Sequence, residues 1–169
     1  MSLSRIHILG GPGSGKTTAA KALSHRLGIP AYSLDNLFWK NGENGGWVRN
    51  DPQSRDRALK EIISGENWIV EGVYYAWLSE SFRRADIVIV LTPGVWIRHW
   101  RLLRRSLKRR IVGEDGARKE SHADVIDLLR YNSNWDHLHL KAALECIEEV
   151  NADVLKCKNV VDAIVELQS

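Results

Sequence analysis

Two hydrophobic patterns alternate along the chain. Short apolar runs, typical of buried parallel strands, lie between longer segments whose apolar residues recur every three or four positions. These runs are Arg5–Leu9, Ile29–Leu34, Trp68–Gly72, Asp86–Leu91 and Asp153–Cys157. Strands that alternate with helices predict an α/β fold, in which helices cover both faces of a parallel sheet.

The longer segments have helical spacing and residues suited to helix ends. We expect helices at Lys16–Leu27, Pro52–Ser64, Tyr74–Arg84, 93–111, 123–131, 138–150 and 160–167. Residues typical of helix caps stand at their ends: Gly28, Asp51 before Pro52, Ser121 with Asp124, and Asn159. Segments 35–50 and 113–119 contain several glycines and polar residues and are predicted to be loops, and a break is expected near 132–134.

A phosphate-binding motif joins the first strand to the first helix. It reads G-x-x-x-x-G-K-[ST] and comprises Gly10, Gly11, Pro12, Gly13, Ser14, Gly15, Lys16, Thr17 and Thr18. Glycines let backbone N–H groups approach a phosphate, and the helix N-terminus favours the anion. Lys16 is expected to reach the β- and γ-phosphates of ATP, and Thr17 to bind Mg²⁺. A glycine-rich turn without a ligand is the alternative, but the flanking strand and helix favour phosphate binding.

Two carboxylates stand at the carboxyl ends of predicted strands, where parallel sheets bind ligands. Asp35 could orient or deprotonate an acceptor hydroxyl, hold Mg²⁺ through water, or cap the following turn. Glu71 could be a Walker-B-type residue near Mg²⁺, or form a salt bridge. Asp86 begins its strand, so a structural role is expected for it.

The helix after Pro93 carries two stripes. The apolar stripe, expected to face the protein, comprises Trp96, Trp100, Leu103, Leu107 and Ile111. The basic stripe comprises Arg98, Arg101, Arg105 and Arg109. Seven cations and no acid lie between Arg98 and Arg110. Because like charges repel at helical spacing, this density favours anion binding over a solvated face. The anion could be a nucleotide phosphate or the backbone of a nucleic acid.

Aromatic residues flank the strand ends that carry Asp35 and Glu71. Trp39, Trp47, Tyr74 and Tyr75 could line an acceptor pocket, or could form the apolar underside of the loops.

Composition adds few constraints. The chain has 169 residues, 44% of them hydrophobic, and a net charge of +3, which suits one globular domain and does not by itself indicate nucleic acid. No apolar run approaches the roughly 18 residues of a membrane span. Cys146 and Cys157 lack metal spacing, and the six histidines form no metal pattern. These features predict a cytoplasmic protein without a membrane partner.

Four segments together resemble a known family: Gly10–Thr18, Leu34–Trp39, Trp68–Tyr74 and the arginine-rich helix after Pro93. They are similar to adenylate-kinase-like P-loop kinases and, more narrowly, to FlaR-related DNA topology modulation proteins. The resemblance implies a three-layer P-loop NTPase fold, with a five-stranded parallel sheet in the order 2-3-1-4-5 and helices on both faces. It also implies ATP and Mg²⁺ use and a small helical lid at about 95–120 that carries arginines. Val73-Tyr74 follows Glu71-Gly72 where adenylate kinases have a Phe-Pro-Arg run, so their acceptor-phosphate arginine has no counterpart there.

The sequence therefore predicts a single-domain ATP-dependent phosphotransferase covering residues 1–169. Lys16, Asp35, Arg101 and Arg105 are the predicted catalytic residues, Gly10–Thr18 would bind ATP, and Thr17 with Glu71 would hold Mg²⁺. The acceptor would be a small molecule with a hydroxyl or phosphate group. One alternative is a nucleic-acid-associated ATP-binding regulator that uses the basic helix. Another is a nucleotide-binding module with little turnover.

Overall fold

The computed structural model describes residues 3–42, 46–112 and 122–166, with side chains except at 109–112, 122–123 and 164–166. The predicted loop 113–119, the cap at Ser121 and the side chains of Arg109, Arg110 and Ile111 lie outside the described residues.

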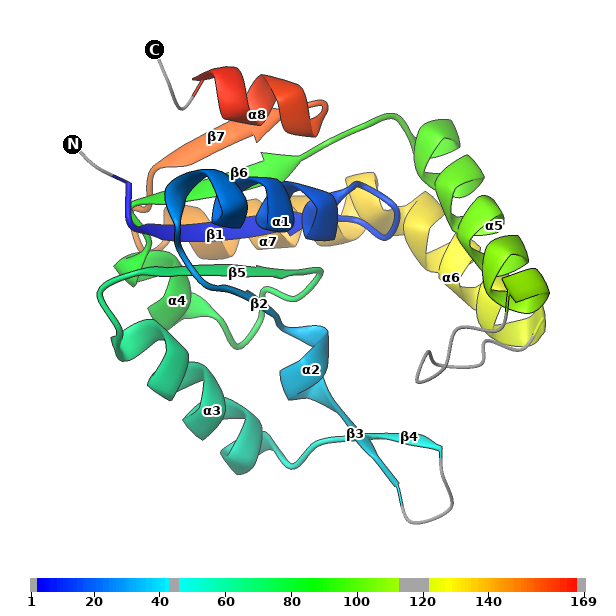
Figure 1. Ribbon diagram of the computed structural model, residues 1–169, viewed down its shortest axis with the longest axis horizontal. Coiled ribbons are helices and arrows are strands. Elements are labelled where there is room, and N and C mark those ends of the chain that lie inside the picture. The colour runs from blue at the N-terminus through cyan, green and yellow to red at the C-terminus, as the bar shows by residue number, and fades with distance from the viewer. Residues whose placement is uncertain (1–2, 43–45, 113–121, 167–169) are drawn as a thin grey trace.

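A five-stranded parallel sheet forms the centre of the molecule, in the order β2-β5-β1-β6-β7 (Figure 1). Its strands are β1 (Arg5–Gly10), β2 (Ala31–Ser33), β5 (Trp68–Gly72), β6 (Ile87–Leu91) and β7 (Val154–Cys157). Counted along the chain within this sheet, the order is 2-3-1-4-5, as expected. In the central strand, Ile8 pairs with Glu71 on β5 and with Ile89 on β6. This register fixes Glu71 close to the end of β1 from which the glycine-rich loop leaves.

Helices cover both faces of the sheet, which confirms the three-layer α/β prediction (Figure 1). On one face, α1 (Lys16–Leu27) and α8 (Val160–Glu166) pack on a core that includes Ile6, Ile8 and Ile89. On the other face, α3 (Pro52–Ser64), α4 (Ser79–Arg84) and α7 (Leu140–Glu148) cover a core that includes Leu9, Val70, Val88 and Val90. Successive residues of β1 alternate between the two cores, as strand geometry requires.

Three predicted helix caps are confirmed. Gly28 has φ of 69° and ends α1. The Asp51 side chain accepts a hydrogen bond from the Ser54 N–H at 2.9 Å, and the Asn159 side chain accepts one from the Asp162 N–H at 2.9 Å. These side chains satisfy N–H groups that the helix itself leaves without partners.

Two predicted boundaries are wrong. The helix expected from Tyr74 begins at Ser79, which leaves Tyr74 in the segment after β5. The helix expected to break near 132–134 continues instead: α6 (His122–Asn134) runs through a π-helical turn, η1 (Trp135–His139), into α7. A π turn keeps the backbone bonded while it shifts the side chains that follow, so it absorbs the irregularity without a loop.

The predicted loop at 35–50 is also partly wrong, because it contains α2 (Asp35–Phe38) and a small hairpin. Strands β3 (Trp39–Asn41) and β4 (Trp47–Arg49) pair antiparallel, with Trp39 opposite Arg49. Each strand has three residues, too few to show an alternating pattern in the sequence. The hairpin projects from the sheet beside α3 (Figure 1).

Helix α5 (Val95–Val112) lies with α6 beyond the end of the sheet, and its orientation contradicts the prediction (Figure 1). Among the side chains of α5 up to residue 108, those of Arg98, Leu102 and Ser106 are buried. The described part of the apolar stripe faces outward, with Trp96 80% and Trp100 68% exposed. The physical reason is the Arg98 side chain, which forms an ion pair and several hydrogen bonds with the neighbouring helical segment and turns that face inward.

Within these same ranges, none of the helices has the length and apolar character that a membrane span requires. Cys146 is half-buried and Cys157 is buried, and they form no disulfide.

Candidate active site

The glycine-rich loop is packed too closely for side chains at three of its glycines, Gly10, Gly11 and Gly13; at Gly10 a Cβ atom would lie 2.8 Å from the backbone oxygen of Leu91. Gly13 has φ of 76°, and a Cβ atom there would lie 2.6 Å from the backbone oxygen of Arg98. A Cβ atom at Gly11 would lie 2.9 Å from the Trp135 ring. The loop thus rests on α5 and on the π-helical turn, which form its floor. The close packing is therefore a second reason, besides phosphate binding, why these positions need a residue without a side chain.

Lys16 is poised for an anion. Its side chain is only 8% exposed, and Nζ donates a hydrogen bond to the Gly11 carbonyl oxygen at 3.0 Å. Burial lowers the pKa of Lys16 to about 8, against the opposing influence of the Glu71 and Asp35 carboxylates. The ammonium group has therefore lost most of its hydration, and its hydrogen bond to Gly11 and the nearby carboxylates replace only part of it. A bound phosphate would restore the missing interaction.

Thr17 and Glu71 meet beside the loop. The Thr17 hydroxyl donates to Glu71 Oε1 at 3.0 Å, and Glu71, at the carboxyl end of β5, is 5% exposed. Among the described residues there is no group of three or more His, Cys, Asp or Glu side chains that could hold a metal ion. Any cation here would share its coordination with water or ligand oxygens.

Asp35 is held in place by an aromatic side chain. Tyr74 Oη donates to Asp35 Oδ1 at 2.8 Å, and the Tyr74 ring stacks on Phe38 with centroids 4.5 Å apart. Burial, together with the Asp35 carboxylate, raises the pKa of Tyr74, so its hydroxyl stays protonated and continues to donate. This bond fixes one carboxylate oxygen of Asp35. The sequence did not predict this hydrogen bond, because Tyr74 was expected within a helix.

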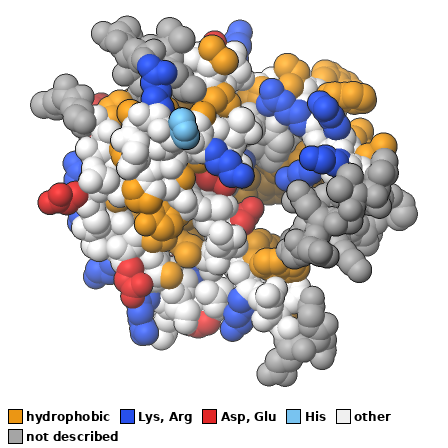
Figure 2. Space-filling model, in the orientation of Figure 1, with side chains coloured by type: hydrophobic (Ala, Val, Ile, Leu, Met, Phe, Trp, Pro, Cys, Tyr) orange, Lys and Arg blue, Asp and Glu red, His pale blue; other side chains and the backbone are white. Residues whose placement is uncertain are grey.

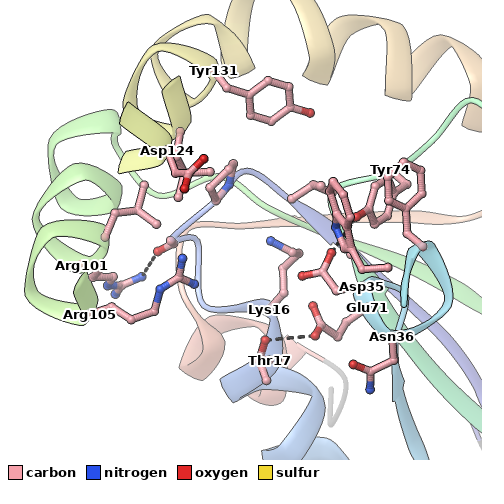
Figure 3. Close-up of a pocket in the computed structure, with 18 of the residues that line it drawn as sticks. Lys16, Thr17, Asp35, Asn36, Glu71, Tyr74, Arg101, Arg105, Asp124 and Tyr131 are labelled. Atoms are coloured by element: carbon pink, nitrogen blue, oxygen red, sulfur yellow. Dashed lines mark hydrogen bonds between the residues drawn. The ribbon is translucent and has the colours of Figure 1, made fainter. Parts of the chain in front are cut away.

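All these groups open into one cavity of about 1080 Å³. Figure 3 shows Lys16, Asp35 and Glu71 close together, while Arg101 and Arg105 reach toward them from α5. Of the four aromatic candidates, Trp39, Trp47 and Tyr74 line the cavity. Tyr75 does not, and its hydroxyl lies 3.2 Å from His139 Nδ1.

The predicted basic stripe divides between two roles. Arg101 donates through Nη1 to the Gly13 and Ser14 carbonyl oxygens, at 3.3 and 3.2 Å, and Arg105 lines the same cavity. Arg98 does not line it. Its fully buried guanidinium forms two 2.8 Å hydrogen bonds to Asp136, and it also donates to Asn132 and Pro93. Arg98 therefore fixes α5 against the π turn and is unavailable to a ligand.

Several residues of this region were not expected from the sequence. Cavity-lining residues without a predicted role in the site include Asn36, Phe38, Arg49, Leu102, Asp124, Asp127, Leu128 and Tyr131. Asn132, Trp135 and Asp136 support the loop or Arg98. Asn132, Trp135 and Asp136 lie where α6 meets the π-helical turn, far along the chain from the glycine-rich loop, and no spacing in the sequence connects them to it.

The fold and the loop define a kinase-like P-loop domain. A family model described as "AAA domain" (AAA_18) matches residues 6–127, and the chain belongs to this family.

Individual relatives are nucleotide kinases or uncharacterised proteins. A "Putative adenylate kinase" of Thermococcus onnurineus (strain NA1) is 32% identical over 127 residues, which cover 73% of this chain and 65% of that protein. "Uncharacterized protein YqaC" of Bacillus subtilis (strain 168) is 33% identical over 104 residues, covering 62% and 57%. A "Cytidylate kinase" of Aeropyrum pernix is 29% identical over 109 residues, covering 58% and 62%. The chain thus spans 57% to 65% of the length of these three relatives.

Solved structures support the same fold. A shikimate kinase from Acinetobacter baumannii, in complex with shikimate, superposes with a TM-score of 0.57 at 20% identity, over 99% of this chain and 93% of that one. A second shikimate kinase, from Bacteroides thetaiotaomicron, gives a TM-score of 0.58 at 19% identity, over 98% and 97%.

Proposed function

We propose that the protein transfers the γ-phosphoryl group of ATP to a small-molecule acceptor. One observation supports this most strongly: Asp35, fixed by Tyr74, opens into the same cavity as Lys16 of the phosphate-binding loop. A nucleotide site and a candidate base in one cavity are what a phosphotransferase requires.

On the nucleotide side, backbone N–H groups of Gly11–Thr18 would surround the phosphates, and Lys16 would contact the β- and γ-phosphates. The pKa of Lys16, lowered to about 8, still leaves the side chain mostly charged at neutral pH. A phosphate would raise this pKa again, so nucleotide binding and lysine protonation support each other.

Thr17 and Glu71 fit a magnesium site. They offer hydroxyl and carboxylate oxygens beside the loop, and Mg²⁺ prefers oxygen ligands. These two residues would hold it, together with phosphate oxygens and water. When bound, Mg²⁺ neutralises charge on the phosphates.

On the acceptor side, Asp35 would orient the acceptor group and take its proton. The acceptor oxygen would form a bond to the γ-phosphorus as the bond to the β-phosphate oxygen breaks, and ADP would leave. A hydroxyl must lose its proton to attack the γ-phosphorus, whereas a phosphate acceptor is already deprotonated. A base at Asp35 therefore favours a hydroxyl acceptor over a phosphate. Trp39, Trp47 and Tyr74 would provide an apolar wall for the rest of the acceptor.

Arg101 and Arg105 would stabilise charge on the transferring group. Their interactions should strengthen in the transition state, because negative charge redistributes over the phosphoryl oxygens during transfer. The Arg101 bonds to loop carbonyl oxygens are compatible with this role, since those bonds can exchange for phosphate contacts.

The test is ADP release from ATP with a panel of acceptors that includes AMP, CMP, nucleosides and shikimate. We expect Lys16→Ala to remove turnover, and Asp35→Asn to reduce turnover more than ATP affinity. Arg101→Ala and Arg105→Ala should each reduce the rate by about 10³-fold, whereas Arg104→Ala, an exposed arginine on the same helix, serves as the matched control. ATP binding without ADP release for any acceptor would support the module with little turnover.

The nucleic-acid alternative loses part of its basis in the sequence. Arg98 is buried and bonded to Asp136, so one of the four predicted stripe residues is unavailable to a nucleic acid, whereas Arg101 is exposed and its bonds to the loop can exchange. Loss of DNA binding in Arg104→Ala, with unchanged turnover in Arg101→Ala and Arg105→Ala, would favour this alternative over the kinase. The narrower resemblance to topology modulation proteins, the single domain with a lid at about 95–120, and the cytoplasmic location stay predictions.

A further inference from the structure

The outward face of α5 is the largest unexplained hydrophobic feature of the described surface. It consists of five residues, which we call the α5 stripe, with these exposed fractions: Trp96 80%, Ile97 50%, Trp100 68%, Leu103 43% and Leu107 61%. Figure 2 shows hydrophobic and basic side chains next to each other in the region of α5. No part of the proposed catalytic site uses this face.

The exposed area is large for a solvated helix. The five fractions correspond to about three full side chains, or roughly 600 Å² at about 200 Å² for each large side chain. A typical monomer has a largest apolar patch of about 300–600 Å², and such patches often have a function. The stripe lies at the upper end of this range, which favours a function for it.

The spacing of the stripe is that of a helix–helix seam. Trp96, Trp100, Leu103 and Leu107 are separated by four, three and four residues, the mean of 3.5 that keeps one narrow line of side chains against a partner helix. Exposed Arg104 borders this line on one flank and partly buried His99 on the other. A bilayer would favour a broader apolar face than this.

The order of side-chain sizes points to a second copy of the same chain. Both tryptophans are in the first half of the line and both leucines in the second half. If two α5 helices pack antiparallel about a two-fold axis between Trp100 and Leu103, each tryptophan lies level with a leucine of the other copy. Large and small side chains then alternate along the contact, as in a self-complementary two-fold interface.

We propose that the α5 stripe is the interface of a homodimer with antiparallel α5 helices. With Ile97 included and every side chain covered, two stripes would bury at most roughly 1,200 Å² in total, at the lower end of the range for specific, stable interfaces. Arg104 and Lys108 would remain at the solvated rim, around a core free of charge. Because these rim charges have the same sign in both copies, the dimer should tighten as salt increases.

This interface is independent of the proposed function, but it would affect the same helix. Arg101 and Arg105 project from α5 toward the cavity, away from the stripe. Packing against a second copy would hold the outer side of the helix that presents them.

The first test is the oligomeric state of the intact chain, measured by sedimentation velocity over a range of concentrations and salt. We expect a dimer that Trp100→Glu weakens by at least about 100-fold, because both copies lose a central contact and gain a buried charge. Trp100 is 68% exposed in the monomer, so this variant should fold, which circular dichroism checks. Val161→Glu is the matched control, since Val161 is 67% exposed on another helix, α8, and is not part of the α5 stripe.

The second test measures the direction of pairing by disulfide crosslinking in a Cys146→Ser background. A mixture of Trp96→Cys and Leu107→Cys chains should crosslink to each other, and neither should crosslink alone, since like positions lie about 16 Å apart along the axis. Crosslinking of Trp96→Cys with itself would overturn the antiparallel dimer. A monomer at every concentration, or a dimer unchanged by Trp100→Glu, would overturn the interface. So would a monomer that binds phosphatidylglycerol vesicles through the stripe.

Discussion

The close packing under the glycine-rich loop can be measured with two alanine substitutions. Gly13 and Gly28 have nearly the same positive φ, 76° and 69°. A Cβ atom at Gly28 meets nothing within 4 Å, whereas one at Gly13 would lie 2.6 Å from the Arg98 carbonyl oxygen. Gly28→Ala therefore reports the conformational cost alone, and Gly13→Ala reports the same cost plus a collision with backbone.

The two contributions have separate magnitudes. The left-handed conformation costs a non-glycine residue about 1–2 kcal/mol, so Gly28→Ala should lower the free energy of unfolding by about 1 kcal/mol. Displacing packed backbone adds about 1–3 kcal/mol, so Gly13→Ala should lower it by about 3 kcal/mol. For a domain of this size the corresponding decreases in Tm are about 3 °C and about 8 °C.

Urea unfolding followed by circular dichroism measures both values, and calorimetry with ATP measures nucleotide binding. We expect Gly28→Ala to bind ATP normally and Gly13→Ala to lose most of its affinity, because the loop must move off Arg98. Equal destabilisation by the two substitutions, or full ATP affinity in Gly13→Ala, would refute the packing argument.

Three further predictions concern buried ionisable groups. Because the pKa of Lys16 is lowered to about 8 and a phosphate favours the charged form, ATP affinity should fall as pH rises above about 8; binding curves between pH 7 and 9.5 test this, and Lys16→Arg should remove the dependence. Burial lowers the pKa of His7 to about 3. Between pH 3 and about pH 6.5 the native state therefore binds fewer protons than the unfolded state. As the pH decreases through this window, the free energy of unfolding should fall by up to about 1.4 kcal/mol per pH unit. Urea unfolding of His7→Asn should show a shallower slope, and equal slopes would contradict the prediction. Asp136→Asn leaves the fully buried Arg98 guanidinium without its counter-charge and should cost about 3 kcal/mol, whereas Asp127→Asn, in an exposed pair with Arg130, should cost less than about 1 kcal/mol in the same assay.

The sheet and the loop motif were predictable because each depends on local patterns. Ile87-Val88-Ile89-Val90 can only be a buried strand in this context. Gly10–Thr18 is recognisable as a phosphate-binding loop from the spacing of its glycines, lysine and threonine alone. The orientation of α5 was not predictable in the same way. Periodicity identifies two stripes on a helix, but it assigns the apolar one to the interior by default. Here the bidentate contact between Arg98 and Asp136 reverses that assignment, and the two residues are far apart in the sequence.

The candidate site shows the same division. Lys16, Thr17 and Glu71 lie together as expected, because a motif and two adjacent strands determine their positions. The bond between Tyr74 and Asp35 depends on an irregular segment after β5, for which the sequence has no repeating pattern. Arg49 and Trp47 reach the cavity only because two three-residue strands form a hairpin.

Because Trp135 lies beneath Gly11, the glycine-rich loop cannot reach its packed conformation during synthesis until Trp135 is present. The motif comes early in the order of synthesis relative to the side chains under it, which belong to the segment that ends α6 and begins the π turn. A nascent or truncated chain that stops after α5 would contain every residue of the motif and four strands of the sheet, yet Gly11 would have no Trp135 beneath it. The packed conformation of the loop would then form only after α6 and the π turn have been synthesised and have docked.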